Sequence, residues 1–309
     1  MILVDYSALC MASLLKTLNS EGKKTLDIDY GKHIILHSLR SNIKAAKGFG
    51  KVAICCDSYG SWRKNKFPHY KAKRKSTREK TGSHIAWEDI FTIIDETKKL
   101  LITSFPAMVL EKHHYEADDI IAAYVYAAGS EEAILIISED KDFYQLLERD
   151  NTFIFHSRKN EVYTKAPYKG TIQLDTLPAQ AKFLNDNQIK AQLQELIIKG
   201  DTIDGIPNVL SDDDCFVEGK RQSPITQKRL TMLKDEGYIA KHPDIQRNME
   251  RNRMLIELKE PALSLSSFIQ EQKDEFEKKL SEISAVQLQN VLMNEGLIQM
   301  ASKAQDFFS

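Results

Sequence analysis

The chain of 309 residues carries 43 Lys and Arg against 44 Asp and Glu, for a net charge of −1, and 42% of its residues are hydrophobic. This composition excludes a disordered polyelectrolyte, and the length suffices for one large domain or two ordinary ones. The near-zero charge argues against a uniformly basic nucleic-acid binder, although segregated charges give the same total. The sequence has no run of 18 apolar residues, no secretory signal pattern and no CxxC pair, so we expect a cytoplasmic protein without a membrane span.

Short apolar runs alternate with helical patterns along the first half of the chain. Strands are predicted at 1–7, 51–58, 105–111, 133–138 and 152–157, and helices at 31–47, at 86–101 and from Glu116 onward. This alternation predicts an α/β fold with a mostly parallel central sheet and helices on both faces. Pro167, Gly170 and Pro178 mark a connecting region, after which the pattern is helical. We therefore predict an α/β domain at 1–185 and a helical domain at 186–309.

Acidic residues follow the ends of the predicted strands and of one helix. They are Asp5, Asp57, Glu116, Asp118, Asp119, Asp140, Asp142, Asp201 and Asp204. Each of them alone is more simply interpreted as a turn or helix-capping residue. Four strands, however, deliver acids to the same edge of the sheet, where open α/β sheets bind their ligands. We therefore expect one shared acidic pocket.

Carboxylates held close together repel one another unless a cation neutralises them. Oxygen ligands without clustered Cys or His suit Mg²⁺, with Mn²⁺ as a substitute, rather than Zn²⁺. Glu116 and Asp119 share a helical face, and Asp140 and Asp142 lie on the same side of an extended chain. The sequence therefore predicts a divalent-metal site at this edge of the sheet.

A strongly basic segment begins six residues after Asp57. Residues 63–80 read RKNKFPHYKAKRKSTREK, with nine Lys or Arg and a single acid. Such a run alone is more simply a solvated loop. Beside an acidic metal site it favours a polyanionic substrate, because the cations attract phosphates while the acids hold metal.

The motifs LVDYS, CCDS followed by WRKNKFPHYKAKR, YEADD, ISEDKDF and KGDTIDGIPNV stand in the order of the flap endonuclease and 5′-nuclease family. The spacing is most similar to the phage ribonuclease H branch of this family, and the resemblance covers roughly residues 1–235. It implies a PIN-like 5′-nuclease fold with a helical arch at about 60–85. It also implies a helix–hairpin module at about 186–235 that grips duplex nucleic acid.

The resemblance also implies roles for individual residues. The matches to Asp5, Asp57, Glu116, Asp118 and Asp140 surround one Mg²⁺, those to Asp142, Asp201 and Asp204 serve a second, and Asp119 belongs to the same cluster. Arg63 and Lys71 match catalytic basic residues that steer the scissile phosphate. Further nucleic-acid contacts are expected from Lys64, Lys66, Tyr70, Lys73 and Arg74.

One segment departs from the cellular branch of the family. Cellular relatives follow IPGV with a Gly-x-Gly hairpin that binds a monovalent cation, whereas here IPNV leads into an insertion, as in the phage branch. The candidates for backbone contacts in this segment are Lys220, Arg221, Lys228 and Arg229. Ordinary solvated helices explain these four residues equally well.

The implied activity is metal-dependent 5′→3′ exonuclease and flap endonuclease cleavage of DNA, and of RNA primers in RNA–DNA hybrids, during lagging-strand replication. The expected substrates are flapped, nicked or 5′-ended duplexes and hybrids, bound by a monomer in the cytoplasm of a host cell if the chain is phage-encoded. Single-strand-binding protein and a sliding clamp are candidate partners. The terminal AQDFFS suits clamp docking, but packing of Phe307 and Phe308 on the body is the favoured interpretation.

Three other classes stay open at this point. A PIN-class ribonuclease would share the acid-ended sheet, but it would be shorter and lack the KGDTIDGIP segment. A haloacid-dehalogenase-like phosphatase would need a second acid two residues after Asp5, where Ser7 stands. A non-catalytic structure-specific DNA-binding protein would keep the basic arch but lose the acids.

Overall fold

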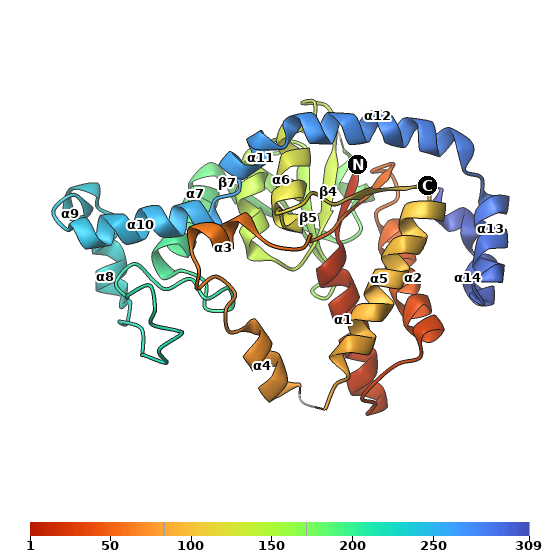
Figure 1. Ribbon diagram of the computed structural model, residues 1–309. Helices are drawn as coiled ribbons and strands as arrows, with labels where there is room; N and C mark the ends of the chain where they lie inside the picture. Colours follow the sequence, from red (N-terminus) through yellow and green to blue (C-terminus); the bar gives the residue numbers. More distant parts are fainter. Residues whose placement is uncertain (83, 171, 309) are drawn as a thin grey trace.

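A seven-stranded β-sheet in the order β3-β2-β1-β4-β5-β6-β7 forms the centre of the molecule (Figure 1). The computed structural model describes residues 1–82, 84–170 and 172–308. The strands are β1 (Ile2–Asp5), β2 (Val52–Cys55), β3 (Ala107–Leu110), β4 (Ile134–Ile137), β5 (Thr152–His156), β6 (Glu161–Ala166) and β7 (Gln180–Asn185). Strands β1 to β5 run parallel, β6 runs antiparallel to β5, and β7 is parallel to β6. The predicted α/β fold with a mostly parallel sheet is confirmed.

Helices cover both faces of the sheet, because successive strand residues point to opposite sides. In β1, Ile2 and Val4 join one hydrophobic cluster and Leu3 joins the other. The first cluster includes residues of α1 (Tyr6–Glu21), α2 (Ile28–Ala45) and α5 (Trp87–Ser104). The second includes residues of α6 (Ala117–Ala127), the 3₁₀ helix η1 (Lys141–Glu148), α11 (Lys259–Ser264) and α12 (Ser266–Glu282). Burial of every residue of β1, β2 and β4 fits a sheet covered on both sides.

Three elements go beyond the sequence prediction. Helix α1 begins at the residue after β1, so Asp5 is both the end of a strand and the cap of a helix. Strands β6 and β7 flank the predicted connecting region, and the short helix η2 (Leu174–Thr176) lies within it. Both strands are partly exposed and carry charged residues, which masked the apolar pattern of a buried strand.

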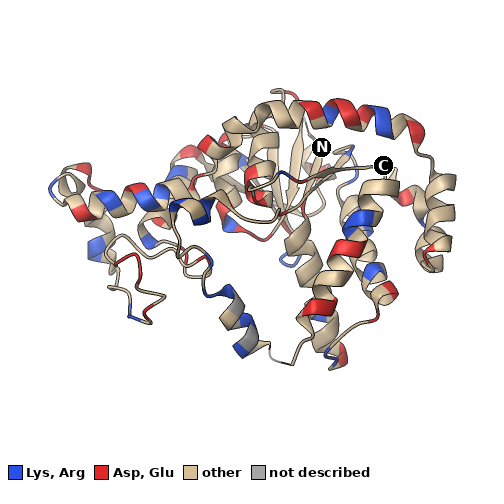
Figure 2. Ribbon diagram, in the orientation of Figure 1, with Lys and Arg blue, Asp and Glu red and all other residues tan. Residues whose placement is uncertain are grey.

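The basic segment bridges β2 and α5 and extends away from the sheet (Figure 1). Its described part contains α3 (Trp62–Lys66) and α4 (Arg74–Thr81), while residue 83 of the predicted arch lies outside the described residues. Figure 2 shows Lys and Arg concentrated on α4 and along α10 (Pro243–Ile256). The basic segment therefore carries a local cluster of positive charge, although the total charge of the chain is near zero.

Residues 186–309 contribute to more than one hydrophobic cluster. Helices α7 (Asp186–Lys199), α8 (Gln227–Met232), α9 (Glu236–Ile239) and α10 contribute to a small cluster of their own. The last elements, α13 (Ala285–Asn294), α14 (Ile298–Ala301) and η3 (Ala304–Phe307), add residues to the first cluster of the sheet. The chain after residue 185 thus does not form one separate core. No helix in the described ranges has the length and apolarity needed to cross a bilayer.

The C-terminal tail packs on the body of the protein, which confirms the favoured interpretation of AQDFFS. Phe307 is 3% exposed, and its ring meets that of Phe105 edge-to-face, with 4.9 Å between centroids. Arg40 pairs with Asp306 beside it. Clamp docking through Phe307 would therefore require this contact to open.

We expect Phe307→Ala to lower the free energy of unfolding by about 3 kcal/mol, because it removes a buried ring and leaves a cavity. Urea unfolding followed by circular dichroism measures this change. Phe183→Ala is the matched control, since Phe183 is 45% exposed on β7 and should change stability by less than about 0.5 kcal/mol. Equal effects of the two substitutions would contradict the docked tail.

Candidate active site

Carboxylates from separate elements converge at the carboxyl ends of the parallel strands. Asp5 accepts a hydrogen bond from the backbone N–H of Ala8 (3.0 Å) and another from Ser138 Oγ (3.3 Å), which ties β1 to the end of β4. Asp57, after β2, accepts a bond from the Ala117 N–H at the start of α6 (2.9 Å). Each acid thus serves as a cap or turn residue and also belongs to the cluster, so the two interpretations made from the sequence coexist.

Burial and mutual repulsion raise the pKa values of this cluster. Burial, then the charges of Asp57 and Asp140, raise the pKa of Asp5 to about 7. Burial, with Asp5 and Asp140 nearby, raises the pKa of Asp118 well above its ordinary value. The pKa of Asp140 is also raised, mainly by burial. The negative charges of neighbouring carboxylates contribute to the raised pKa values of Asp5 and Asp118, so these acids share one pocket.

Asp142 extends the cluster toward the loop after α7. Burial, followed by the charge of Asp140 and then of Asp201, raises the pKa of Asp142 to about 8. Its Oδ1 atom is buried and has no hydrogen-bond partner among the described residues. A buried oxygen without a donor, in a set made only of oxygen ligands, fits a hard divalent cation. The residues present therefore fit the Mg²⁺ that the sequence predicts.

The loop after α7 brings a second group of acids to the pocket. Gly200 has a φ of +66°, and a Cβ on it would lie 2.3 Å from the Ile206 carbonyl, so only glycine allows this turn. Asp201 accepts bonds from the N–H groups of Ile203 (2.7 Å) and Asp204 (3.2 Å). The loop is thereby closed into a compact turn that holds Asp204 against the basic segment.

Lys71 and Tyr70 bridge the two groups of acids. The Lys71 ammonium pairs with Glu116 and lies 3.6 Å from Asp204 Oδ2. The Tyr70 hydroxyl contacts Glu116 (2.8 Å) and Asp204 (2.9 Å), and Arg74 also pairs with Asp204. Burial alone would raise the pKa of Asp204. The positive charges of Lys71 and Arg74 have the larger effect, so the pKa of Asp204 lies below its ordinary value.

The backbone of Lys71 is held in the left-handed region, with φ of 55°. Its N–H donates to the Asp204 carbonyl (2.7 Å), which fixes this uncommon conformation. Among the described residues, no three Asp, Glu, His or Cys side chains already stand in a metal-holding arrangement. Glu116 and Asp204 instead face cations of the basic segment.

A network behind the pocket is built around Arg63. Arg63 is 2% exposed and donates to both oxygens of Asp119 (2.8 and 2.9 Å), to Glu116 (3.0 Å) and to the Leu255 carbonyl (2.8 Å). Trp62 Nε1 also donates to Asp119 (3.0 Å), which is fully buried. Enclosed in this way, Arg63 and Asp119 reach neither a phosphate nor a metal from solvent. This burial corrects the phosphate-steering role predicted for Arg63 and the metal-binding role predicted for Asp119. Both side chains instead hold Glu116 in position.

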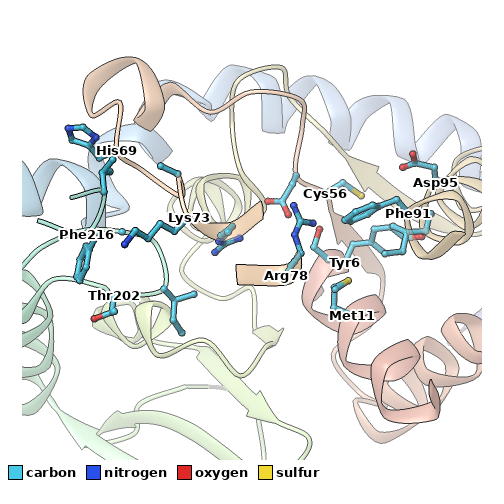
Figure 3. Close-up of a pocket in the computed structure, with 18 of the residues that line it drawn as sticks. Tyr6, Met11, Cys56, His69, Lys73, Arg78, Phe91, Asp95, Thr202 and Phe216 are labelled. Carbon is cyan, nitrogen blue, oxygen red and sulfur yellow. The ribbon is translucent and has the colours of Figure 1, made fainter. Parts of the chain in front are cut away.

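A cavity of about 900 Å³ opens beside Asp57, beneath α4 (Figure 3). Lys73 and Arg78 of the basic segment line one part of it, and Phe91 of α5 lines another. Phe216, from the segment after IPNV, lines the opposite side. The acid pocket therefore has an adjoining chamber with both positive and aromatic walls.

The sequence matches a known family over more than half of its length. The family model described as "5'-3' exonuclease, N-terminal resolvase-like domain" matches residues 1–173. The chain belongs to the 5′-3′ exonuclease family. Members of this family are nucleases, so the acid pocket is the candidate active site of a phosphodiester hydrolase.

Two curated relatives agree with this assignment of a 5′-nuclease. The chain is 30% identical over 231 residues to "Ribonuclease H" of Enterobacteria phage T4, covering 71% of this chain and 67% of that protein. It is 31% identical over 167 residues to the "5'-3' exonuclease" of Buchnera aphidicola subsp. Acyrthosiphon pisum, covering 53% and 54% of the two chains.

Solved structures of the bacteriophage T5 D15 protein share the fold of this 5′-nuclease. A flap endonuclease complex with DNA and metal ions has a TM-score of 0.61 at 18% identity and covers 91% of this chain and 97% of that chain. The T5 D15 protein co-crystallised with metal ions has a TM-score of 0.57 at 19% identity and covers 92% and 98%. Metal ions and DNA are thus features of these neighbours.

The other predicted nucleic-acid residues of the 5′-nuclease have mixed surroundings. Lys64, Lys66 and Lys73 are exposed. Tyr70 is buried between acids, so its predicted contact with nucleic acid is corrected to a hydrogen-bonding role between those acids. Lys220 pairs with Asp214 (3.2 Å). The remaining three, Arg221, Lys228 and Arg229, are exposed. The nucleic-acid role of the exposed residues stays a prediction.

Sequence reasoning missed Ser138 and the residues after IPNV that line the chamber. Ser138 stands between β4 and Glu139, and its hydroxyl both donates to Asp5 and accepts from the Asp140 N–H (3.2 Å). Its position directly before Glu139 and Asp140 in the sequence could have identified Ser138 as a residue of the site. Phe216 carried no signal, because only the fold brings it to the cavity that adjoins Asp57.

We expect Arg63→Ala to destabilise the 5′-nuclease by about 3–5 kcal/mol, because it leaves the buried Asp119 without its partner. Thermal and urea unfolding measure the loss. Lys64→Ala is the control, since Lys64 lies on the same helix but is exposed and should change stability by less than about 0.5 kcal/mol. A fully stable Arg63→Ala protein would refute the positioning role.

The pH dependence of Asp5 has a definite sign. Its folded pKa of about 7 exceeds the unfolded value of about 3.9, so ionisation destabilises the fold increasingly between pH 4 and pH 8. In metal-free protein, Asp5→Asn should therefore raise the melting temperature relative to the wild type, by an amount that grows from pH 5 to pH 8. A difference that is constant or shrinks over this range would be inconsistent with the raised pKa.

Proposed function

We propose that this chain is a divalent-metal-dependent 5′-nuclease that cleaves 5′ flaps and 5′ ends of duplex DNA and removes RNA paired to DNA. The observation that carries the proposal is the convergence of acids from β1, β2, β4, α6 and the loop after α7. The raised pKa values of Asp5, Asp118 and Asp142 indicate a pocket that favours bound cations. The family membership supplies the reaction class.

Two groups of acids would hold two Mg²⁺ ions. Asp5, Asp57, Glu116, Asp118 and Asp140 would serve one, and Asp142, Asp201 and Asp204 the other. Bound ions would supply an activated water and stabilise the leaving oxygen. The metal ions in the T5 neighbours support this assignment.

Lys71 and Arg74 would contribute the positive charge of the chain itself. Both side chains pair with carboxylates of the pocket. Metal ions bound by those carboxylates would free the two side chains from these pairs. Their freed ammonium and guanidinium groups would then stabilise negative charge on the phosphoryl oxygens. Arg63 holds Glu116 in place and takes no part in this contact.

The surfaces around the pocket support a branched substrate. The exposed cations of 64–73 would bind the strand that carries the 5′ end. The segment 186–235, with Lys220, Arg221, Lys228 and Arg229, would bind the duplex backbone. The name of the T4 relative supports RNA–DNA hybrid as a further substrate, in primer removal during lagging-strand replication. Single-strand-binding protein and a sliding clamp are the partners expected in that process.

The decisive variant is Asp140→Asn. An amide oxygen can still accept the hydrogen bond from the Asp142 N–H (2.9 Å), so the cap of η1 is retained. We expect single-turnover cleavage of a labelled 5′ flap in Mg²⁺ to fall by at least about a hundredfold, while duplex binding is unchanged. Mg²⁺ should also raise the melting temperature of the wild type more than that of the variant.

Asp175→Asn, at an exposed site in η2, is the matched control and should behave as the wild type. The same assay on a nicked duplex and an RNA–DNA hybrid, each with Mg²⁺ and with chelator, defines the substrate range. Near-normal cleavage by Asp140→Asn, or cleavage in chelator, would rule out the proposed site.

A further inference from the structure

The segment 202–217 supplies an apolar wall to the chamber beneath α4. Ile203 is 77% exposed and Val217 46% exposed, and both line the same cavity as Phe216. Large exposed apolar side chains gathered at one site mark a binding surface. None of the three was singled out in the sequence: Ile203 lies in the KGDTIDGIPNV motif, and Phe216 and Val217 lie in the insertion that follows it.

Cations and an aromatic ring face this wall across the cavity. In Figure 3, Phe216 and Phe91 lie on opposite sides, with Lys73 and Arg78 between them. The Arg78 guanidinium lies 5.2 Å from the centroid of the Phe91 ring and 5.8 Å from that of Trp87. Neither Lys73 nor Arg78 forms an ion pair with another residue in the described ranges, so both are available to anions.

The end of the wall at Ile203 is fixed beside the basic segment. Gly205 has a φ of +72°, and a Cβ on it would lie 2.9 Å from the His69 carbonyl, so the two backbones are in close contact. The Lys71 N–H bonds to the Asp204 carbonyl one residue away (2.7 Å). The position of Ile203 relative to Lys73 is therefore part of the fold.

We propose that Ile203, Phe216 and Val217 form a base-binding wall that makes the enzyme select unpaired nucleotides next to the scissile phosphate. An unpaired base offers an open π-face to apolar and aromatic side chains, whereas the bases of a duplex are already stacked. Phosphates of the same strand lie toward Lys73 and Arg78. The cavity of about 900 Å³ lies in the range of sites that enclose small ligands, and it adjoins Asp57.

This inference rests on the proposed function, because it places the strand relative to the metal-binding acids. It adds a source of selectivity that the acids and the basic segment do not provide. Cations alone bind any phosphate backbone, whether single-stranded or paired. Contact with the base faces distinguishes the two.

The test compares the variant Phe216→Ala/Val217→Ser with the matched control Phe183→Ala/Val286→Ser. The control removes exposed residues of the same types from β7 and α13, at 45% and 66% exposure. Each protein cleaves 5′ flaps whose first unpaired nucleotides are either normal or abasic, under single-turnover conditions in Mg²⁺. Melting curves verify that both variants are folded.

The wild type and the control should cleave the abasic flap about tenfold more slowly than the normal flap, which is the size of a single base-stacking contact. The wall variant should cleave the normal flap about tenfold more slowly and should no longer distinguish it from the abasic flap. A wall variant that discriminates as the wild type does would overturn the inference.

A second readout does not depend on cleavage. With 2-aminopurine as the first unpaired base, binding in chelator should change its fluorescence with the wild type and the control but not with the wall variant. If the wild type cleaves no substrate, the proposed function fails, while this signal still decides whether the wall holds a base. Equal signals from all three proteins would reject the wall.

Discussion

Repulsion among buried carboxylates is the constraint around which this protein is arranged. Asp5, Asp118, Asp140 and Asp142 share one pocket, and burial together with the charges of neighbouring acids of the site raises the pKa of each. A fold that gathers acids in this way loses stability when they ionise, unless cations compensate. A site that binds divalent metal ions requires such a cluster of buried acids.

The acids divide into two classes according to their partners. Glu116, Asp119 and Asp204 are paired with Arg63, Lys71 or Arg74, all from the basic segment. Ion pairs with Asp5, Asp118, Asp140 and Asp142 are absent from the described part of the chain. The paired class joins the segment to the pocket, and the second class has no cation of the chain bound to it. This division explains why one basic run contains both a fully buried arginine and exposed lysines.

The chamber beneath α4 connects the acids to the surface that would select the substrate. Its positive side comes from the basic segment and its apolar side from residues after α7, two regions far apart in the sequence. The Lys71–Asp204 backbone bond and the contact of Gly205 with His69 hold them together. The two regions therefore meet beside Asp204, which belongs to the acid cluster.

The sequence by itself determined the five parallel strands, their covered faces and the list of acids, because strand periodicity and residues at strand ends are local features. It did not reveal α1 directly after Asp5, nor the partly exposed β6 and β7, whose patterns lack a clear apolar period. Only the tertiary structure decided which residues touch the site. Arg63 bonds to Leu255 and Tyr70 to Asp204, both partners more than 130 positions away along the chain. Phe216 and Asp57 line one cavity only because the fold brings their segments together. Burial and pairing depend on these distant neighbours, so no local pattern could have distinguished a buried arginine from an exposed one.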